Sequence, residues 1–233
     1  MIAGENKIAN AFGGQIFLHV VLADDAARKK PLKHDETVGT VKFANAVAMP
    51  TYVEGKDNAK SWRQSLAKSP APWGTLVAKN VILHLPRADM EKLADPGPLL
   101  AWWDKVIHLE DDLVALQRHA PERIVTDAQI DGGWMHSGYP FMCYLESGHN
   151  MCDLAKLSKI GDWGFFHELG HNHQNNKWTF TEGADQVEVT CNFFSLYCMN
   201  KLVGLPLEQA HDSKPKVEKL LAQRLASPPN LSS

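Results

Sequence analysis

Residues 161–174 read Gly-Asp-Trp-Gly-Phe-Phe-His-Glu-Leu-Gly-His-Asn-His-Gln, and the five from His167 to His171 match the pattern H-E-x-x-H. Side chains four positions apart on a helix lie on one face at a separation of about 6 Å. His167 and His171 can therefore bind a single ion, with Glu168 directed towards the same cavity. This stretch predicts a metal site carried by a helix.

The regions around this motif predict a pair of helices. The first runs from about Trp163 to Gln174, with Asp162 as a plausible N-cap, and the second runs from about Asp185 to Leu202. The chain between them is long enough for a turn and an antiparallel return, so the second helix can face the first.

A catalytic zinc site needs a third protein ligand and one coordination position left open for water. Carboxylates follow the motif at Glu182, Asp185 and Glu188. Glu188 is the best candidate because it lies within the second predicted helix. Glu182 adjoins Gly183 in the connecting loop, where we expect it to be solvated.

With zinc held in this way, Glu168 is predicted to act as the general base that takes a proton from the attacking water, and the reaction class is amide hydrolysis. The alternatives are a structural zinc site or a helix without metal. A structural site would close the fourth position with another Cys or His. His173 is nearby, but two residues after His171 it points to a different side of the helix.

Asn192 lies one turn after Glu188 on the same face of the second helix. It could accept a hydrogen bond from the ring nitrogen of a zinc-bound histidine that is not used for the metal. The alternative is an asparagine packed between helices, and the sequence does not separate the two.

The rest of the chain predicts an α+β fold. With 44% hydrophobic and 22% charged residues, its 233 residues can bury one large core or two small ones. Strand patterns at 15–22, 40–48, 81–85 and 123–130 lie on both sides of an amphipathic helix over 98–116. The aromatic residues of that helix are expected in the core.

The Gly-rich loop 132–140 is a candidate wall of the substrate cleft. Stabilising the oxyanion of amide hydrolysis needs a hydrogen-bond donor, and the loop offers His136 and Tyr139. Tyr139 is the preferred choice. The alternative is that Tyr139 packs the loop onto the core.

The four cysteines are too few and too irregularly spaced for a disulfide scaffold. Cys191 and Cys198 lie about 10 Å apart along one predicted helix and cannot bridge each other, so we expect buried thiols. Cys143 and Cys152 could form a disulfide in an oxidising compartment.

Charge and hydropathy exclude several classes of function. A net charge of -3 with both signs scattered argues against nucleic acid as a partner. No apolar run approaches the roughly 20 residues of a membrane-spanning helix. Residues 1–10 show no secretory signal, so we expect either a cytosolic protein or a missing true start.

Residues 161–174, Trp178-Thr179 and 188–197 together resemble the M60-like, enhancin-type, peptidase family. The resemblance extends to four further segments, at 12–16, 70–73, 121–125 and 136–140.

The resemblance implies a gluzincin-like core with an active-site helix pair, truncated at its C-terminus. It implies a domain over 12–205, with a β-rich half at about 12–86 and a zinc-site half at about 98–203, followed by an extension over 206–233. It also carries His167, His171 and Glu188 over as zinc ligands and Glu168 as catalytic base.

The family resemblance further implies an endopeptidase that acts on O-glycosylated, mucin-like proteins, either secreted or at the cell surface. A second class remains open, because the same domain occurs in channel-associated factors, which would be non-catalytic binding proteins. Glu168 favours the enzyme, since a scaffold has no need of a base that is not a ligand.

Overall fold

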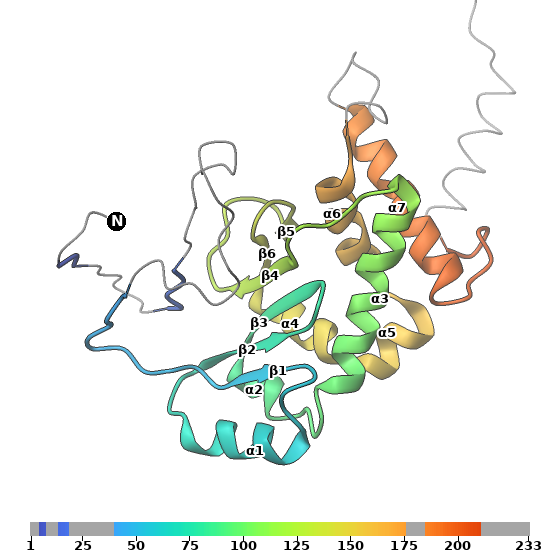
Figure 1. The fold of residues 1–233 in the computed structure, drawn as a ribbon. Helices are drawn as coiled ribbons and strands as arrows, with labels where there is room; N and C mark the ends of the chain where they lie inside the picture. Colours follow the sequence, from blue (N-terminus) through green and yellow to red (C-terminus); the bar gives the residue numbers. More distant parts are fainter. Residues whose placement is uncertain (1–4, 8–13, 19–39, 176–184, 211–233) are drawn as a thin grey trace, which may run out of the picture. The chain divides into compact units, whose positions relative to one another are not determined.

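The computed structural model describes residues 5–7, 14–18, 40–175 and 185–210 (Figure 1). The chain divides into two units, residues 1–46 and 47–233. Among the described residues before Thr51, none lies in a helix or strand. The strand prediction for 40–48 is therefore wrong. The prediction for 15–22 is wrong over 15–18, and its remainder lies outside the described residues.

A mixed sheet forms the centre of the second unit. Its strands are β1 (Thr51–Val53), β2 (Trp73–Val77), β3 (Val81–Pro86), β4 (Glu122–Asp127), β5 (Met135–His136) and β6 (Phe141–Tyr144), in the order β1-β2-β3-β4-β6-β5. β2 and β3 are antiparallel, with Leu76 opposite Leu83, and β5 pairs antiparallel with β6. The other neighbours are parallel.

Two of these strands were expected from the sequence. The prediction for 81–85 is confirmed by β3, whereas the strand predicted over 123–130 ends earlier, at Asp127. Together with the helices, the sheet confirms the α+β class.

The second unit contains seven described helices. They are α1 (Ala59–Lys68), α2 (Arg87–Met90), α3 (Gly97–Val114), α4 (Leu145–Cys152), α5 (Leu154–Ile160), α6 (Trp163–His173) and α7 (Asp185–Lys201). The helices predicted over 98–116, 163–174 and 185–202 correspond to α3, α6 and α7. α3 ends at Val114 because Ala115 adopts a left-handed conformation with φ 54°.

The core joins α3 to α6 and to the sheet. The indole of Trp103 meets the ring of Phe165 edge-on at 5.3 Å, and Phe141 of β6 lies 5.9 Å from the same ring. Trp103 also donates a hydrogen bond to the Met151 carbonyl at 3.0 Å. The tryptophans of α3 are therefore core residues, as expected, and they pack against the phenylalanines of α6.

All four cysteines are free thiols, so the pairing considered for Cys143 and Cys152 is not formed. Burial raises the pKa of each of these two thiols to about 12. Cys191 and Cys198 are buried, as expected. Among the described residues, none of the helices is both long and apolar enough to cross a membrane.

Candidate metal centre

α6 begins at a well-capped terminus and has one buried face. The Asp162 carboxylate accepts hydrogen bonds from the backbone N–H groups of Gly164 at 3.1 Å and Phe165 at 3.4 Å, which confirms the predicted N-cap. Phe165 and Leu169 are completely buried against the core. The half-buried His167 and His171 therefore share another face, with ring centroids 4.8 Å apart.

α7 packs directly against this helix. A Cβ atom added at Gly170 would lie 2.9 Å from the Cβ of Phe194 and 3.0 Å from the Cys191 carbonyl. A glycine at this position thus allows the backbones to approach closely. The contact explains why the glycine of the H-E-x-x-H stretch stands between the two histidines.

Close packing brings Glu188 of α7 to both histidines. Its Oε2 atom lies 3.1 Å from Nε2 of His167 and 3.5 Å from Nε2 of His171. A tetrahedral zinc site with bonds of about 2.0–2.2 Å has ligand atoms about 3.3–3.6 Å apart. The three side chains selected from the sequence therefore converge in a donor set that fits zinc.

Amide side chains orient both rings. Nδ1 of His167 donates to Oδ1 of Asn192 at 2.8 Å, and Nδ1 of His171 donates to Oε1 of Gln174 at 3.0 Å. Each ring then keeps its Nε2 lone pair for the side facing Glu188. Asn192 was predicted in this position, whereas Gln174 was not. The signal available for Gln174 was its spacing of three residues from His171.

Cys191 is the fourth donor-bearing residue of this group, whose candidate ligand atoms all lie within 4.8 Å of one another. Its Sγ atom is 3.3 Å from Nδ1 and 3.4 Å from Nε2 of His167, so it lies against the face of the ring and not on the Nε2 lone pair. It also donates to the Glu188 carbonyl at 3.1 Å. We assign Cys191 a packing role.

The base predicted beside the metal, Glu168, faces a pocket. The residues that line it are Gly132, Gly133, Met135, His136, Ser137, Glu168, His171, Val187 and Glu188. The Ser137 N–H donates to Oε2 of Glu168 at 3.0 Å. Burial raises the pKa of Glu168 above its ordinary value. The Gly-rich loop thus forms one wall of the pocket.

The structure separates the two loop residues considered for the oxyanion. His136 lines the pocket, whereas Tyr139 is not among the lining residues and is 53% exposed. Nδ1 of His136 donates to the Ser137 carbonyl at 2.9 Å. Of the alternative third ligands, Glu182 and the side chain of Asp185 lie outside the described residues.

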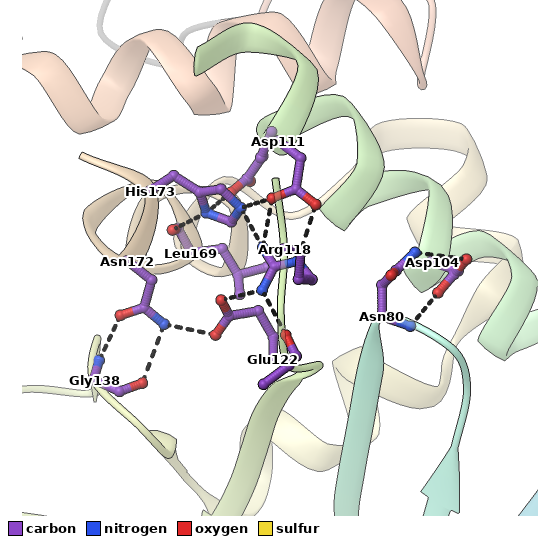
Figure 2. Close-up of polar contacts among 11 residues, drawn as sticks. Asn80, Asp104, Asp111, Arg118, Glu122, Gly138, Leu169, Asn172 and His173 are labelled. Atoms are coloured by element: carbon purple, nitrogen blue, oxygen red, sulfur yellow. Dashed lines mark hydrogen bonds and ion pairs between the residues drawn. The ribbon is translucent and has the colours of Figure 1, made fainter. Parts of the chain in front are cut away.

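His173 points away from the metal group, as predicted, into a buried ionic network (Figure 2). Its Nε2 atom lies 3.0 Å from Oδ1 of Asp111, and its Nδ1 atom lies 3.1 Å from Oε2 of Glu110. Burial alone would lower the pKa of His173, but its hydrogen bonds to Asp111 and Glu110 raise it to about 10. Burial raises the pKa of Glu110 to about 7.

Comparison with known proteins extends these observations. Residues 45–220 match the family described as peptidase M60, enhancin and enhancin-like. The chain is 39% identical over 209 residues to TRPM8 channel-associated factor 2 of Bos taurus, covering 89% of this chain and 22% of that protein. It is 43% identical to its Mus musculus counterpart, covering 74% of this chain and 19% of that protein. The chain thus spans about a fifth of these relatives.

Solved structures share the fold. A conserved protein of unknown function from Bacillus anthracis str. Ames superposes with a TM-score of 0.61 at 25% identity, covering 76% of this chain and 37% of that one. The catalytic module of the metalloprotease ZmpA from Clostridium perfringens gives a TM-score of 0.53 at 18% identity, covering 76% and 36%. The second likeness bears on the fold alone.

Proposed function

The chain belongs to the peptidase M60, enhancin and enhancin-like family, and from this premise we propose that it is a zinc-dependent endopeptidase with a gluzincin core. The observation that carries the proposal is the convergence of His167, His171 and Glu188, with the Glu168 carboxylate beside them in the same pocket. A purely structural zinc site would not need a carboxylate that is not a ligand.

In this proposal His167, His171 and Glu188 hold the zinc ion, with Asn192 and Gln174 orienting the rings. A bound zinc ion supplies Lewis acidity that polarises the scissile carbonyl and acidifies water. Glu168 takes the proton of the attacking water and returns it to the leaving amine. The Ser137 N–H binds Oε2 of Glu168, which leaves Oε1 for the proton.

Several finer proposals rest on the family. They are a peptidase domain over 12–205 with a short extension over 206–233, an O-glycosylated, mucin-like protein substrate, and a secreted or cell-surface location. For the oxyanion donor, Tyr139 stays a prediction. His136 is the alternative, and its place in the pocket lining supports it.

Exchanging the base and a ligand separately tests the proposal. Glu168→Gln should keep zinc bound but lose most turnover, because an amide cannot accept the proton, whereas His171→Ala should lose the metal itself. Bound zinc is measured in the purified proteins, and cleavage of an O-glycosylated mucin is followed with and without chelator. Full activity of Glu168→Gln would exclude this mechanism.

The relatives named TRPM8 channel-associated factors favour a second candidate, a non-catalytic protein that associates with a channel. The two candidates differ in the need for Glu168. Channel association should be unchanged in Glu168→Gln, whereas peptide cleavage should be lost. A zinc-loaded wild-type protein that binds the channel and cleaves no substrate would support the second candidate.

A further inference from the structure

Asn172 on α6 binds both main-chain polar groups of Gly138 (Figure 2). Its Oδ1 atom accepts from the Gly138 N–H at 2.8 Å, and its Nδ2 atom donates to the Gly138 carbonyl at 3.1 Å and to Oε2 of Glu122 at 3.0 Å. Because Nδ2 faces two acceptors and Oδ1 faces a donor, only this orientation of the amide satisfies every partner. Asn172 therefore fastens the pocket loop to the helix that carries the metal motif.

Glu122, the other partner of the Asn172 amide, is itself held by a buried ionic network. Arg118 donates to Oε1 of Glu122 at 2.7 Å and to both carboxylate oxygens of Asp111 at 2.9 Å and 2.7 Å. Asp111 belongs to α3 and also contacts His173. Glu122 and Asp111 are only 8% and 7% exposed, so these charge-assisted bonds are shielded from water. The network joins the loop to the core through α3.

Neighbouring amides of the loop reach the same face of α6. The Ser137 N–H donates to Glu168, and the next N–H, of Gly138, donates to Asn172, four residues further along the helix. Gly138 has a φ of 128°, a backbone conformation that side-chain-bearing residues rarely adopt. Because Ser137 and Gly138 are adjacent in the chain, a shift of Gly138 would carry the Ser137 N–H away from Glu168.

We propose that Asn172 is a positioning residue of the active centre. By holding Gly138 it keeps the Ser137 N–H on Oε2 of Glu168 and fixes the wall of the substrate pocket. The catalytic consequence rests on the proposed function, because only a peptidase uses Glu168 as a base. The pair of hydrogen bonds between Asn172 and Gly138, called the clamp below, does not depend on that function.

The test is Asn172→Ala in the zinc-loaded protein. Amide hydrogen exchange at Ser137 and Gly138 should accelerate about five- to tenfold, the effect of losing a hydrogen bond worth about 1 kcal/mol. Zinc affinity should stay within about twofold of wild type, because the three ligands and their amide partners are intact. The kcat for a peptide substrate should fall about tenfold with little change in KM, because the base loses its orientation.

Asn200→Ala is the matched control, since it removes an equivalent bond from a side-chain amide to the Leu205 carbonyl at the other end of α7. It should leave loop exchange and kcat unchanged. Gly138→Ala disturbs the same hydrogen bonds from the loop side, because alanine rarely adopts the φ of 128° found at this position. This variant replaces Asn172→Ala if Asn172→Ala does not fold. It should reproduce the faster exchange at Ser137.

Unchanged exchange at Ser137 and Gly138 in both variants would overturn the clamp. Faster exchange with an unchanged kcat would overturn the positioning role. If the zinc-loaded wild-type protein cleaves no substrate, the proposed function fails by itself, and the exchange rates still decide whether Asn172 holds the loop.

Discussion

The two imidazoles of the candidate metal centre depend on single amide groups for their orientation. His167 is held by Asn192 from α7, and His171 is held by Gln174 from the end of its own helix. Gln174 is in turn fixed by hydrogen bonds to Thr190 and to the Val187 carbonyl. Helical spacing predicted Asn192. The spacing of Gln174 from His171 was not enough to predict its role, because that role also depends on contacts with α7 beyond the helix end.

Removing either amide should weaken the metal site without unfolding the protein. Asn192→Ala leaves Nδ1 of His167 without its acceptor, and we expect zinc affinity to fall about 10- to 100-fold. Competition with a chromophoric chelator measures it. Asn192→Asp retains an oxygen acceptor and should bind zinc more tightly than the alanine variant. Equal affinity in wild type and Asn192→Ala would show that the amide does not orient the ligand.

Contact between α6 and α7 is the element-scale feature on which the metal group depends. α6 anchors through Phe165 and Leu169 to the core, and Gly170 brings the α7 backbone close enough for Glu188 to reach both histidines. The candidate zinc ligands His167, His171 and Glu188 thus converge because these two helices pack closely.

Gly170→Ala should push these helices apart. The added Cβ would meet Phe194 and a backbone carbonyl at 3.0 Å or less, an overpacking cost of about 1–3 kcal/mol. The gain in helix propensity, about 1 kcal/mol, offsets only part of it. We expect the free energy of unfolding in urea to fall by about 1 kcal/mol and zinc affinity to fall as well.

Gly164→Ala is the matched control on the same helix, because its added Cβ would meet the flexible end of Met135 at 3.1 Å and Oδ1 of Asp162 at 3.5 Å, which is an ordinary van der Waals contact. It should keep both stability and zinc affinity. If Gly170→Ala were as stable as Gly164→Ala and bound zinc as well, close packing of the helices would not be what forms the site.

Sequence reasoning succeeded for the three longest described helices and for the buried strands β3 and β4, but it failed for exposed segments and for several shorter elements. α3, α6 and α7 were predicted, whereas the run Ile16 to Leu18 looked like a strand but is exposed and does not lie in a strand. α1 was missed although Asn58 and Ser61 form a capping box, a signal readable in the sequence. α4 contains Gly148 and has little intrinsic helix propensity.

At the scale of the whole molecule, polar groups buried between elements decide how the fold responds to pH. His84 of β3 is 2% exposed and lies between β2 and β4 in the sheet. One nitrogen of its ring, Nε2, faces the guanidinium of Arg123, and the other, Nδ1, lies 3.0 Å from the hydroxyl of Thr75. Since a guanidinium has no acceptor, Nε2 must be unprotonated, and His84 is a neutral Nδ1–H imidazole in the folded protein.

Acid should therefore unfold the protein partly through His84. Burial, with the charge of Arg123, lowers its pKa from 6.5 to about 3 in the folded state. Between these values the unfolded chain binds a proton that the folded chain does not. The stability due to the neutral ring is fully present above about pH 6.5 and is lost as pH falls, by at most about 1.4 kcal/mol per pH unit. Urea unfolding from pH 7 to pH 4 measures this slope.

Replacing His84 separates its contribution to the acid sensitivity of folding from the contribution of the carboxylates. His84→Gln keeps an oxygen acceptor for Arg123 but takes up no proton in this range, so its stability should fall less steeply with acid than that of wild type. Leu76→Val, a truncation of a fully buried residue in the same sheet, should be less stable at every pH but keep the wild-type slope. Equal slopes for His84→Gln and wild type would mean that His84 gains no proton on unfolding. The acid sensitivity would then come from paired carboxylates such as Asp111, whose pKa burial would raise but hydrogen bonds from His173 and Arg118 lower.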